Sequence, residues 1–327
     1  MKNLALSRSS LIEVALLSIT LIWALNFSVI KGNLDEIDPL SFNGLRFLFA
    51  AAVIWGALLW KGQSISVPRR DWLPLIGMGL LANLVYQGLF IIGIDYTYAA
   101  NVAVIMGTIP IWVALIAHLF SDEKLDLLKS IGVALAFGGV VFIMLGGSKE
   151  LDFGSDTFIG DLLTIAATVV WGTYTVLSRN FLKRYTALQF SAITTTIGAI
   201  TLFLVGLPSM TTIAWSNVSL GAYGAVIYSG LLSIGVAYII WNYAIQEVGA
   251  VHTATYQNLV PVLGLIFGVI LLGEELAFQQ YLGSALVIGG IVLARWKKSK
   301  RRNIKPQITN DRKAPSKPQR EPELLEE

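Results

Sequence analysis

The sequence predicts an all-α polytopic membrane protein, with ten transmembrane helices arranged as two inverted five-helix repeats. Composition is the first observation: 55% of the 327 residues are hydrophobic and only 14% are charged, where a soluble domain carries about 25% charged residues. The second is that nearly uncharged apolar runs recur from Leu11 to Ala294, most of them close to the roughly 20 residues that a helix needs to cross a bilayer. The third is that the second half of the chain repeats features of the first.

The apolar runs place the ten spans in chain order. They lie near residues 11–30, 39–60, 72–94, 97–120, 127–146, 159–178, 186–207, 220–244, 249–272 and 279–296. The first run follows Lys2 and Arg8, as in a signal peptide, but it is long enough to span and no small-residue cleavage site closes it. We therefore expect a helix there. Beyond Arg302 the chain is polar and almost free of large apolar residues, which predicts a disordered tail.

Lysine and arginine gather on one side of these spans, which sets the orientation. With a cytoplasmic N-terminus, 16 of them lie in inner segments, including the cluster Arg295–Arg302, and only Lys31 and Lys149 lie in outer loops. We predict that both termini face the cytoplasm, and the short loops and absence of cysteine fit a bacterial inner membrane. The Arg295–Arg302 cluster would contact anionic lipid headgroups. We expect the lipid bilayer as a partner, and no nucleic acid.

Several classes of chemistry lack the residues they need. The chain has no cysteine and only two histidines, His118 and His252, so we expect no cofactor and no metal site. It has no HExxH motif, no G-x-S-x-G motif and no paired intramembrane aspartates, which argues against an enzyme. A channel would need rings of repeated pore residues, and none are found.

The two halves of the chain match at a nearly constant offset. An offset of 151 pairs Pro110 with Pro261, Glu123 with Glu274, Leu125 with Leu276, Gly132 with Gly283 and Gly138-Gly139 with Gly289-Gly290. Earlier in each half the offset is 148, and it pairs Trp23 with Trp171. Because each copy holds five spans, an odd number, the second copy must enter the membrane in the opposite sense. We predict a first repeat at residues 1–148, a second at 149–297 and a cytoplasmic tail at 298–327.

Sequence motifs in both copies resemble the EamA family of the drug/metabolite transporter superfamily. They are "LIWALNFSVIK" and "FNGLRFLFAA" in the first copy, and "AYIIWNYAI" and "PVLGLIFGVILLGEELAFQQYLGSALVIGGIVL" in the second. The resemblance covers about residues 11–296. It implies ten helices and export of small metabolites, often amino acids or related amines, by alternating access. Inverted repeats are typical of secondary transporters, whose site lies near the midplane where the halves meet.

Polar and aromatic side chains at inferred mid-membrane depth predict a shared substrate cavity. The candidates are Trp23, Asn26, Tyr86, Gln87, Trp171, Tyr174, Tyr238, Trp241, Tyr256 and Asn258. Polar groups facing lipid would be costly, and aromatic rings offer cation–π contacts to an ammonium group. For any one of these residues, helix packing is the alternative role.

Prolines and glycines mark further positions in the spans. Pro110 and Pro261 fall near the centres of the fourth and ninth spans, where a proline removes a backbone hydrogen bond. We predict hinges there, with an ordinary packing kink as the alternative. For the glycines of the fifth and tenth spans we expect helix packing, within the protomer or across a homodimer.

Charges inside the spans are few. Arg46 lies about two turns inside the second span, and we predict that it forms a structural or gating ion pair with Asp95, with Glu36 and Asp38 as other candidate partners. Direct binding of a substrate carboxylate is the alternative. If transport is coupled to a proton, Glu13 and His118 are the candidates to carry it.

We expect a secondary transporter of a small-molecule substrate. The runner-up is a nucleotide-sugar or phosphate-ester antiporter of the same superfamily. Its dianionic cargo would need lysine or arginine in the cavity, and Arg46 alone lies well within a span. Neutral, zwitterionic or cationic cargo is therefore favoured.

Overall fold

A computed structural model describes residues 8–119, residues 131–143 in part, and residues 156–295. These residues form helices and no strand. Eight helices are long and apolar enough to cross a membrane: Ser10–Lys31, Pro39–Trp60, Arg69–Tyr96, Ala99–Leu119, Asp156–Phe181, Ala187–Met210, Leu220–Val248 and Ala250–Leu272. A further helix, α14 (Phe278–Arg295), occupies the predicted tenth span. The predicted fifth span lies largely outside the described residues, and the predicted tail lies wholly outside them.

Four of the spans are single continuous helices, and two of them have clear start signals. They are α1 (Arg8–Lys31), α2 (Pro39–Trp60), α8 (Asp156–Phe181) and α9 (Ala187–Met210). Asp38 begins α2, because its carboxylate accepts the first free backbone N–H groups and proline follows at the first helical position. Thr186 and Gln189 form a reciprocal capping box at the start of α9.

The other four spans are interrupted. A π-helical segment, η1 (Leu80–Val85), separates α3 (Arg69–Gly79) from α4 (Tyr86–Tyr96), and η3 (Ser229–Val236) separates α10 (Leu220–Tyr228) from α11 (Ala237–Val248). A turn at Gly107 and Thr108 separates α5 (Ala99–Met106) from α6 (Ile109–Leu119). A 3₁₀ segment, η4 (Thr255–Leu259), separates α12 (Ala250–Ala254) from α13 (Val260–Leu272).

These interruptions fall at equivalent positions in the two halves. The offset of 151 carries residues 80–85 onto 231–236, inside η3, and residues 107–108 onto 258–259, inside η4. Pro110 and Pro261 are each the second residue of the helix that follows the break. A proline in a first turn costs little there, because its missing N–H would have no helical partner.

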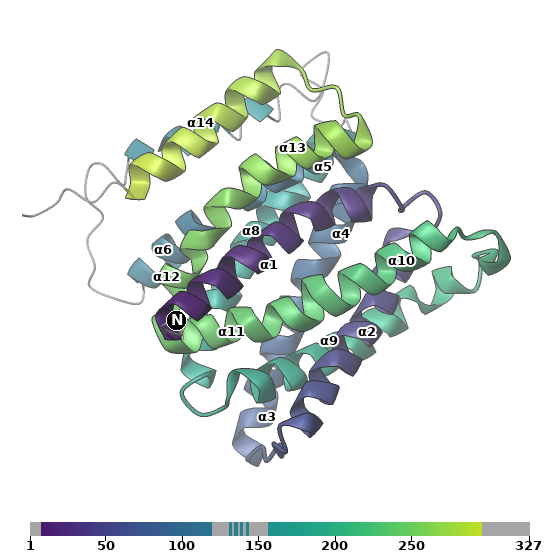
Figure 1. The fold of residues 1–327 in the computed structure, drawn as a ribbon, viewed down its shortest axis with the longest axis vertical. Helices are drawn as coiled ribbons and strands as arrows, with labels where there is room; N and C mark the ends of the chain where they lie inside the picture. Colours follow the sequence, from purple (N-terminus) through teal and green to yellow (C-terminus); the bar gives the residue numbers. More distant parts are fainter. Residues whose placement is uncertain are drawn as a thin grey trace, which may run out of the picture. The chain divides into compact units, whose positions relative to one another are not determined.

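Helices from the two halves pack closely against each other. The neighbours include α2 with α9, α5 with α13, and α1 with α13 (Figure 1). Between α5 and α13 the approach is tight: a Cβ added at Gly264 would lie 2.1 Å from Ala103 Cβ, and one added at Gly107 would lie 2.1 Å from Pro261 Cγ. Small residues allow this approach, as is usual for membrane helices.

Helix α14 packs within the chain on Gly132, Ala136, Gly139 and Ile143, through glycines. A Cβ added at Gly139 would lie 2.6 Å from the Gly283 carbonyl oxygen, and one at Gly290 would lie 2.5 Å from the Gly132 carbonyl oxygen. Gly138 and Gly289, which are equivalent in the two halves, have no atom within 4 Å of an added Cβ. The expected glycine packing is therefore found inside the protomer at Gly139, Gly283 and Gly290.

The outer faces of the spans are apolar, as a bilayer requires. Leu59, Leu73 and Ile270 are 71%, 80% and 72% exposed, while polar side chains such as Asn43 and Thr195 are fully buried. This reverses the arrangement of a soluble protein, in which exposed apolar patches are small. The chain is an integral membrane protein.

Candidate functional site

A small cavity lies where the interrupted helices meet α1, α2 and α8. Its lining consists of Trp23, Asn26, Phe27, Arg46, Tyr86, Gln87, Phe90, Met106, Ile109, Trp171, Ser233, Ile234, Tyr238, Gln257 and Val260. All four interruptions border it. Tyr86 follows η1, Met106 and Ile109 flank the turn between α5 and α6, Ser233 lies in η3 and Gln257 lies in η4. Irregular helical segments of this kind are frequent at functional sites.

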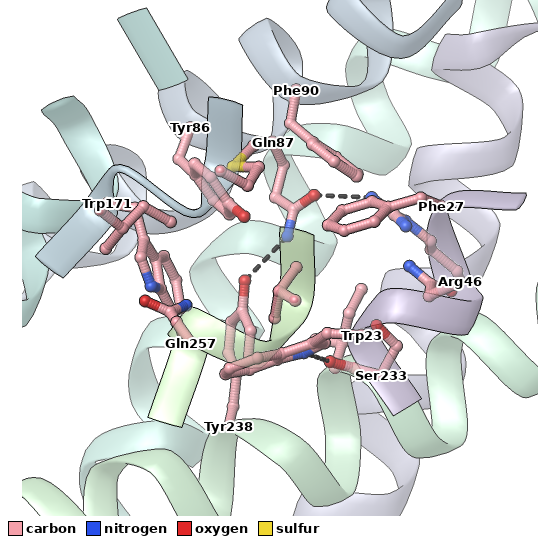
Figure 2. Close-up of a pocket in the computed structure, with 15 residues that line it drawn as sticks. Trp23, Phe27, Arg46, Tyr86, Gln87, Phe90, Trp171, Ser233, Tyr238 and Gln257 are labelled. Atoms are coloured by element: carbon pink, nitrogen blue, oxygen red, sulfur yellow. Dashed lines mark hydrogen bonds between the residues drawn. The ribbon is translucent and has the colours of Figure 1, made fainter. Parts of the chain in front are cut away.

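Aromatic rings form much of the wall, and Trp171 of α8 contacts three of them (Figure 2). Its ring centroid lies 4.7 Å from that of Tyr86, 5.3 Å from that of Tyr238 and 6.3 Å from that of Trp23. The Trp23 indole N–H donates to the Ser233 carbonyl oxygen at 2.8 Å, which fixes the Trp23 ring against η3. Rings held in this way offer flat apolar faces to a ligand, and to a cation in particular.

A chain of hydrogen bonds crosses the cavity from α2 to α11. Arg46 Nη2 donates to Gln87 Oε1 at 2.6 Å, and Gln87 Nε2 donates to the Tyr238 hydroxyl at 2.8 Å (Figure 2). Arg46 also donates to Asn43 Oδ1 at 2.8 Å and to the Ser229 hydroxyl at 2.9 Å. These bonds hold the guanidinium group rigidly at the edge of the cavity.

The ion pair that the sequence predicted between Arg46 and Asp95 is not found among the described residues. Every hydrogen bond of Arg46 goes to a neutral acceptor. Of the candidate partners, Asp95 accepts from the Lys31 ammonium through its backbone carbonyl, and Asp38 caps α2 through Oδ1. The Glu36 carboxylate accepts from the Ser219 N–H and hydroxyl, which hold the pKa of Glu36 below its usual value. In this structure Arg46 lines the cavity and is not paired with Asp95.

Six of the ten predicted substrate residues line the cavity, and four lie behind or beside it. The six are Trp23, Asn26, Tyr86, Gln87, Trp171 and Tyr238. Trp241 packs behind Trp23 with ring centroids 5.2 Å apart, and Tyr174 hydrogen-bonds to Asn242 at 3.3 Å. Tyr256 and Asn258 are half-buried and outside the lining.

Gln257 was not predicted as a site residue, but the structure places it in the cavity wall. Its sequence neighbours Tyr256 and Asn258, which were predicted, are not in the lining. Three consecutive residues of a helix point in three directions, so only one of Tyr256, Gln257 and Asn258 can face the cavity squarely. The 3₁₀ winding of η4 selects Gln257. Its Oε1 atom is buried without a hydrogen-bond partner among the described residues, and so are Asn26 Oδ1 and Trp171 Nε1. Three lining residues therefore hold unused hydrogen-bonding capacity.

A second polar cluster, away from the cavity, also escaped the sequence analysis. The carboxylate of Asp161 on α8 is fully buried and accepts from Thr97 Oγ1 at 2.7 Å and from Asn101 Nδ2 at 3.3 Å. Asn101 Oδ1 in turn accepts from Gln280 Nε2 at 2.8 Å. The cluster joins α8, α5 and α14.

The Glu274 carboxylate caps the N-terminus of α5. It accepts from the backbone N–H groups of Ala99 and Ala100 at 2.6 and 3.0 Å. Burial raises the pKa of Glu274, an effect that these hydrogen bonds and Lys31 partly offset. The acid that interrupts the apolar sequence after the ninth span therefore caps a helix in the other half of the chain.

Apolar helices of spanning length around a polar and aromatic cavity are typical of helical membrane transporters. The EamA-like transporter family matches the chain twice, at residues 10–145 and 158–296, and the chain belongs to this family. It is 31% identical to the uncharacterized transporter YyaM of Bacillus subtilis (strain 168), over 86% of this chain and 93% of that protein. It is also 31% identical to an uncharacterized transporter of Archaeoglobus fulgidus, over 85% of this chain and 95% of that protein.

A solved crystal structure shares the fold. Its TM-score is 0.63 at 20% sequence identity, and the match covers 88% of this chain and 97% of that one. The relatives are named as transporters, and the protein is a transporter rather than an enzyme.

Proposed function

We propose that the protein is a ten-helix secondary transporter that exports small metabolites, amino acids or related amines, by alternating access between two inverted repeats. One observation carries the proposal: residues that are equivalent in the two halves touch each other at the cavity. Gln87 and Tyr238, 151 residues apart, share a hydrogen bond of 2.8 Å. Trp23 and Trp171, 148 residues apart, pack edge to face at 6.3 Å. Equivalent residues of a two-fold pair meet only near the axis, so the cavity would lie on it.

The matched helix interruptions support the same proposal. Inverted-repeat transporters bind their substrates where discontinuous helices meet near the midplane, and here each half contributes two interrupted spans to the cavity wall. The paired prolines after two of the breaks, Pro110 and Pro261, are placed where a half-helix could pivot. We propose them as hinges.

The cavity is narrow in this conformation, as alternating access requires of a closed state. Its volume is about 40 Å³, where one water needs about 10–15 Å³ on the same measure. It has room for a few waters, and an amino acid would enter only after the aromatic walls separate. Movement of Trp23 away from Trp171 would open the wall between the two halves.

The phosphate-ester antiporter is less well supported. Arg46 is the only lysine or arginine among the described lining residues. A phosphate dianion is usually met by several cationic or backbone donors, and one guanidinium does not balance its charge.

Transport by the purified protein in proteoliposomes tests the proposal. We expect counterflow of labelled amino acids or amines by the wild type, and at least a tenfold loss in Trp171→Ala, because this substitution removes the ring against which three lining aromatics pack. Trp60→Ala is the control, since Trp60 is 84% exposed on the outer face. Equal transport by Trp171→Ala and the wild type would contradict the proposed site.

A further inference from the structure

Two contacts join the halves of the chain at opposite ends of α2. In one, the Glu36 carboxylate of the α1–α2 corner accepts from the Ser219 N–H at 2.6 Å and from the Ser219 hydroxyl at 2.8 Å, at the start of α10. In the other, the Asp71 carboxylate at the start of α3 accepts from Arg184 Nη1 and from the Tyr185 hydroxyl of the α8–α9 corner, both at 2.6 Å. The α1–α2 corner precedes α2 and α3 follows it. Because α2 runs for 22 residues without a break, about 33 Å separates its ends.

The two contacts are equivalent under the sequence repeat. The offset of 148 carries Glu36 onto Arg184, so the two corners contribute the same position of the repeat. The helix starts that they meet are equivalent as well, because the N-caps of α3 and α10, Pro68 and Ser219, are 151 residues apart. If the repeats are inverted, such a paired contact occurs once at each face of the membrane.

Each contact ties an interrupted span to a corner between two continuous helices. Helices α1 and α2 are unbroken, and so are α8 and α9, whereas η1 interrupts α3–α4 and η3 interrupts α10–α11. Beyond the break, these two spans reach the cavity wall through Tyr86 and Tyr238. A π-helical break is a place where a helix bends. Each contact therefore restrains the first part of a span whose second part lines the cavity.

The two contacts differ in strength. The Asp71 side chain is only 7% exposed, and it meets the positive charge of Arg184 as well as a hydroxyl group. Glu36 is exposed and meets only the neutral donors of Ser219. Opposite charges attract more strongly where one partner is shielded from water, and exposed contacts compete with water. The Asp71 contact is therefore the stronger of the two.

We propose that these contacts are latches that close the transport pathway, one at each face of the membrane. Both are formed in this structure, in which the cavity is only about 40 Å³. With the N-terminus in the cytoplasm, release of the Glu36 latch frees α10 and opens the external face. Release of the Asp71 latch frees α3 and opens the cytoplasmic face. This inference rests on the proposed alternating access and names the contacts that break in each of its steps.

The cysteine-free chain allows the latches to be tested by labelling. Ser233→Cys places one thiol in the cavity wall, and its rate of reaction with a small membrane-impermeant methanethiosulfonate is measured in intact cells and in inside-out vesicles. In this background Glu36→Ala should raise the rate in intact cells by about 2- to 10-fold, the range that the net worth of a hydrogen bond gives. Asp71→Ala should raise the rate in inside-out vesicles by about 10-fold or more, because its contact includes an ion pair. Neither variant should raise the rate from the opposite face.

Matched controls lie beside each latch. Asp35→Ala and Arg69→Ala remove exposed charges near Glu36 and Asp71, and both should label at the rates of the Ser233→Cys parent. Faster labelling from the same face in both latch variants, or unchanged rates in both, would overturn the inference. Should Asp71→Ala fail to fold, Tyr185→Phe decides at that face, because it removes only the hydroxyl that donates to Asp71. An unchanged rate in inside-out vesicles would then refute the latch.

The labelling needs no substrate, so the latches and the proposed function can fail separately. Opposite shifts in the two latch variants, without transport of any amino acid or amine, would support the latches and contradict the proposed cargo. Transport by the wild type, with unchanged labelling in both variants, would contradict the latches and leave the proposed function standing.

Discussion

At the scale of single residues, Asp161 shows how polar groups fasten these helices together. It is fully buried, and its oxygens accept from Thr97 and Asn101 of the other half of the chain. A buried acceptor that satisfies two donors contributes mainly by preventing the penalty that unpaired donors would carry. The role of Asp161 is therefore best tested by replacements that differ in their capacity to accept hydrogen bonds, and not only in size.

We predict that Asp161→Leu lowers the free energy of unfolding by about 2–4 kcal/mol, because two buried donors lose their acceptor. Asp161→Asn keeps an acceptor oxygen and should lose less than half as much. Thermal unfolding in detergent measures both. Asp156→Leu on the same helix is the control, since Asp156 is exposed. An Asp161→Leu protein as stable as the wild type would show that the cluster has no structural role.

Residue types and depths were predictable from the sequence, and side-chain directions were not. The spans place Trp23, Tyr86 and Trp171 at similar predicted depths, and all three line the cavity. When a span is apolar on all sides, its sequence does not show which side of the helix faces the cavity. Asn258 was therefore predicted to face the cavity, whereas Gln257 does so. The predicted ion pair of Arg46 is not found for a related reason: the sequence supplies nearby acids but not their contacts. Asp38 and Glu36 accept from backbone N–H groups, while Lys31 donates to the backbone carbonyl of Asp95.

At the scale of elements, the spans were predicted well because bilayer thickness fixes their length. Among the described spans, the largest difference between a predicted and an observed end is at the eighth span, which was placed at 220–244 and runs over Leu220–Val248. The π-helical segments η1 and η3 were not predicted. Their residues are as apolar as the rest of the span, so hydropathy carries no sign of the altered winding.

Glu274 couples the stability of α5 to pH. Because burial raises its pKa, the folded protein holds this proton more tightly than the unfolded chain does. Stability from this group is therefore greatest below the ordinary value of 4.5 and falls as pH rises through the raised pKa. We predict that Glu274→Gln flattens this part of the melting-temperature profile. Glu275→Gln, at the exposed neighbouring position, should keep the wild-type profile, and identical profiles for all three proteins would refute the assignment.

The repeat predicts a matching role for Glu123, which lies outside the described residues. Adding 151 carries Ala99 and Ala100, the positions capped by Glu274, onto Ala250 and Val251 at the start of α12. We expect Glu123→Ala and Glu274→Ala to lower the free energy of unfolding by similar amounts, about 1 kcal/mol each, as for loss of a helix cap. Chemical or thermal unfolding measures this, with Glu275→Ala as the control. A neutral Glu123→Ala beside a destabilised Glu274→Ala would argue against symmetric halves.

At the scale of the whole molecule, the two halves of the chain correspond in sequence and touch each other at equivalent residues. The family match falls separately on each half of the chain, and equivalent residues from the two halves meet in the cavity wall. The lysine and arginine distribution predicts the orientation of the chain in the membrane, with both termini in the cytoplasm. Five spans per half, as the sequence predicts, would require the halves to cross the membrane in opposite senses.

The absence of cysteine from the chain allows a direct test of this inversion. Asp35 and Lys183 are equivalent at the offset of 148, and both are exposed. Single-cysteine variants at these positions would be treated with a membrane-impermeant maleimide, first in intact cells and then in inside-out vesicles. Inverted repeats predict labelling of Asp35→Cys in intact cells only and of Lys183→Cys in inside-out vesicles only. Labelling of both from the same side of the membrane would contradict the account.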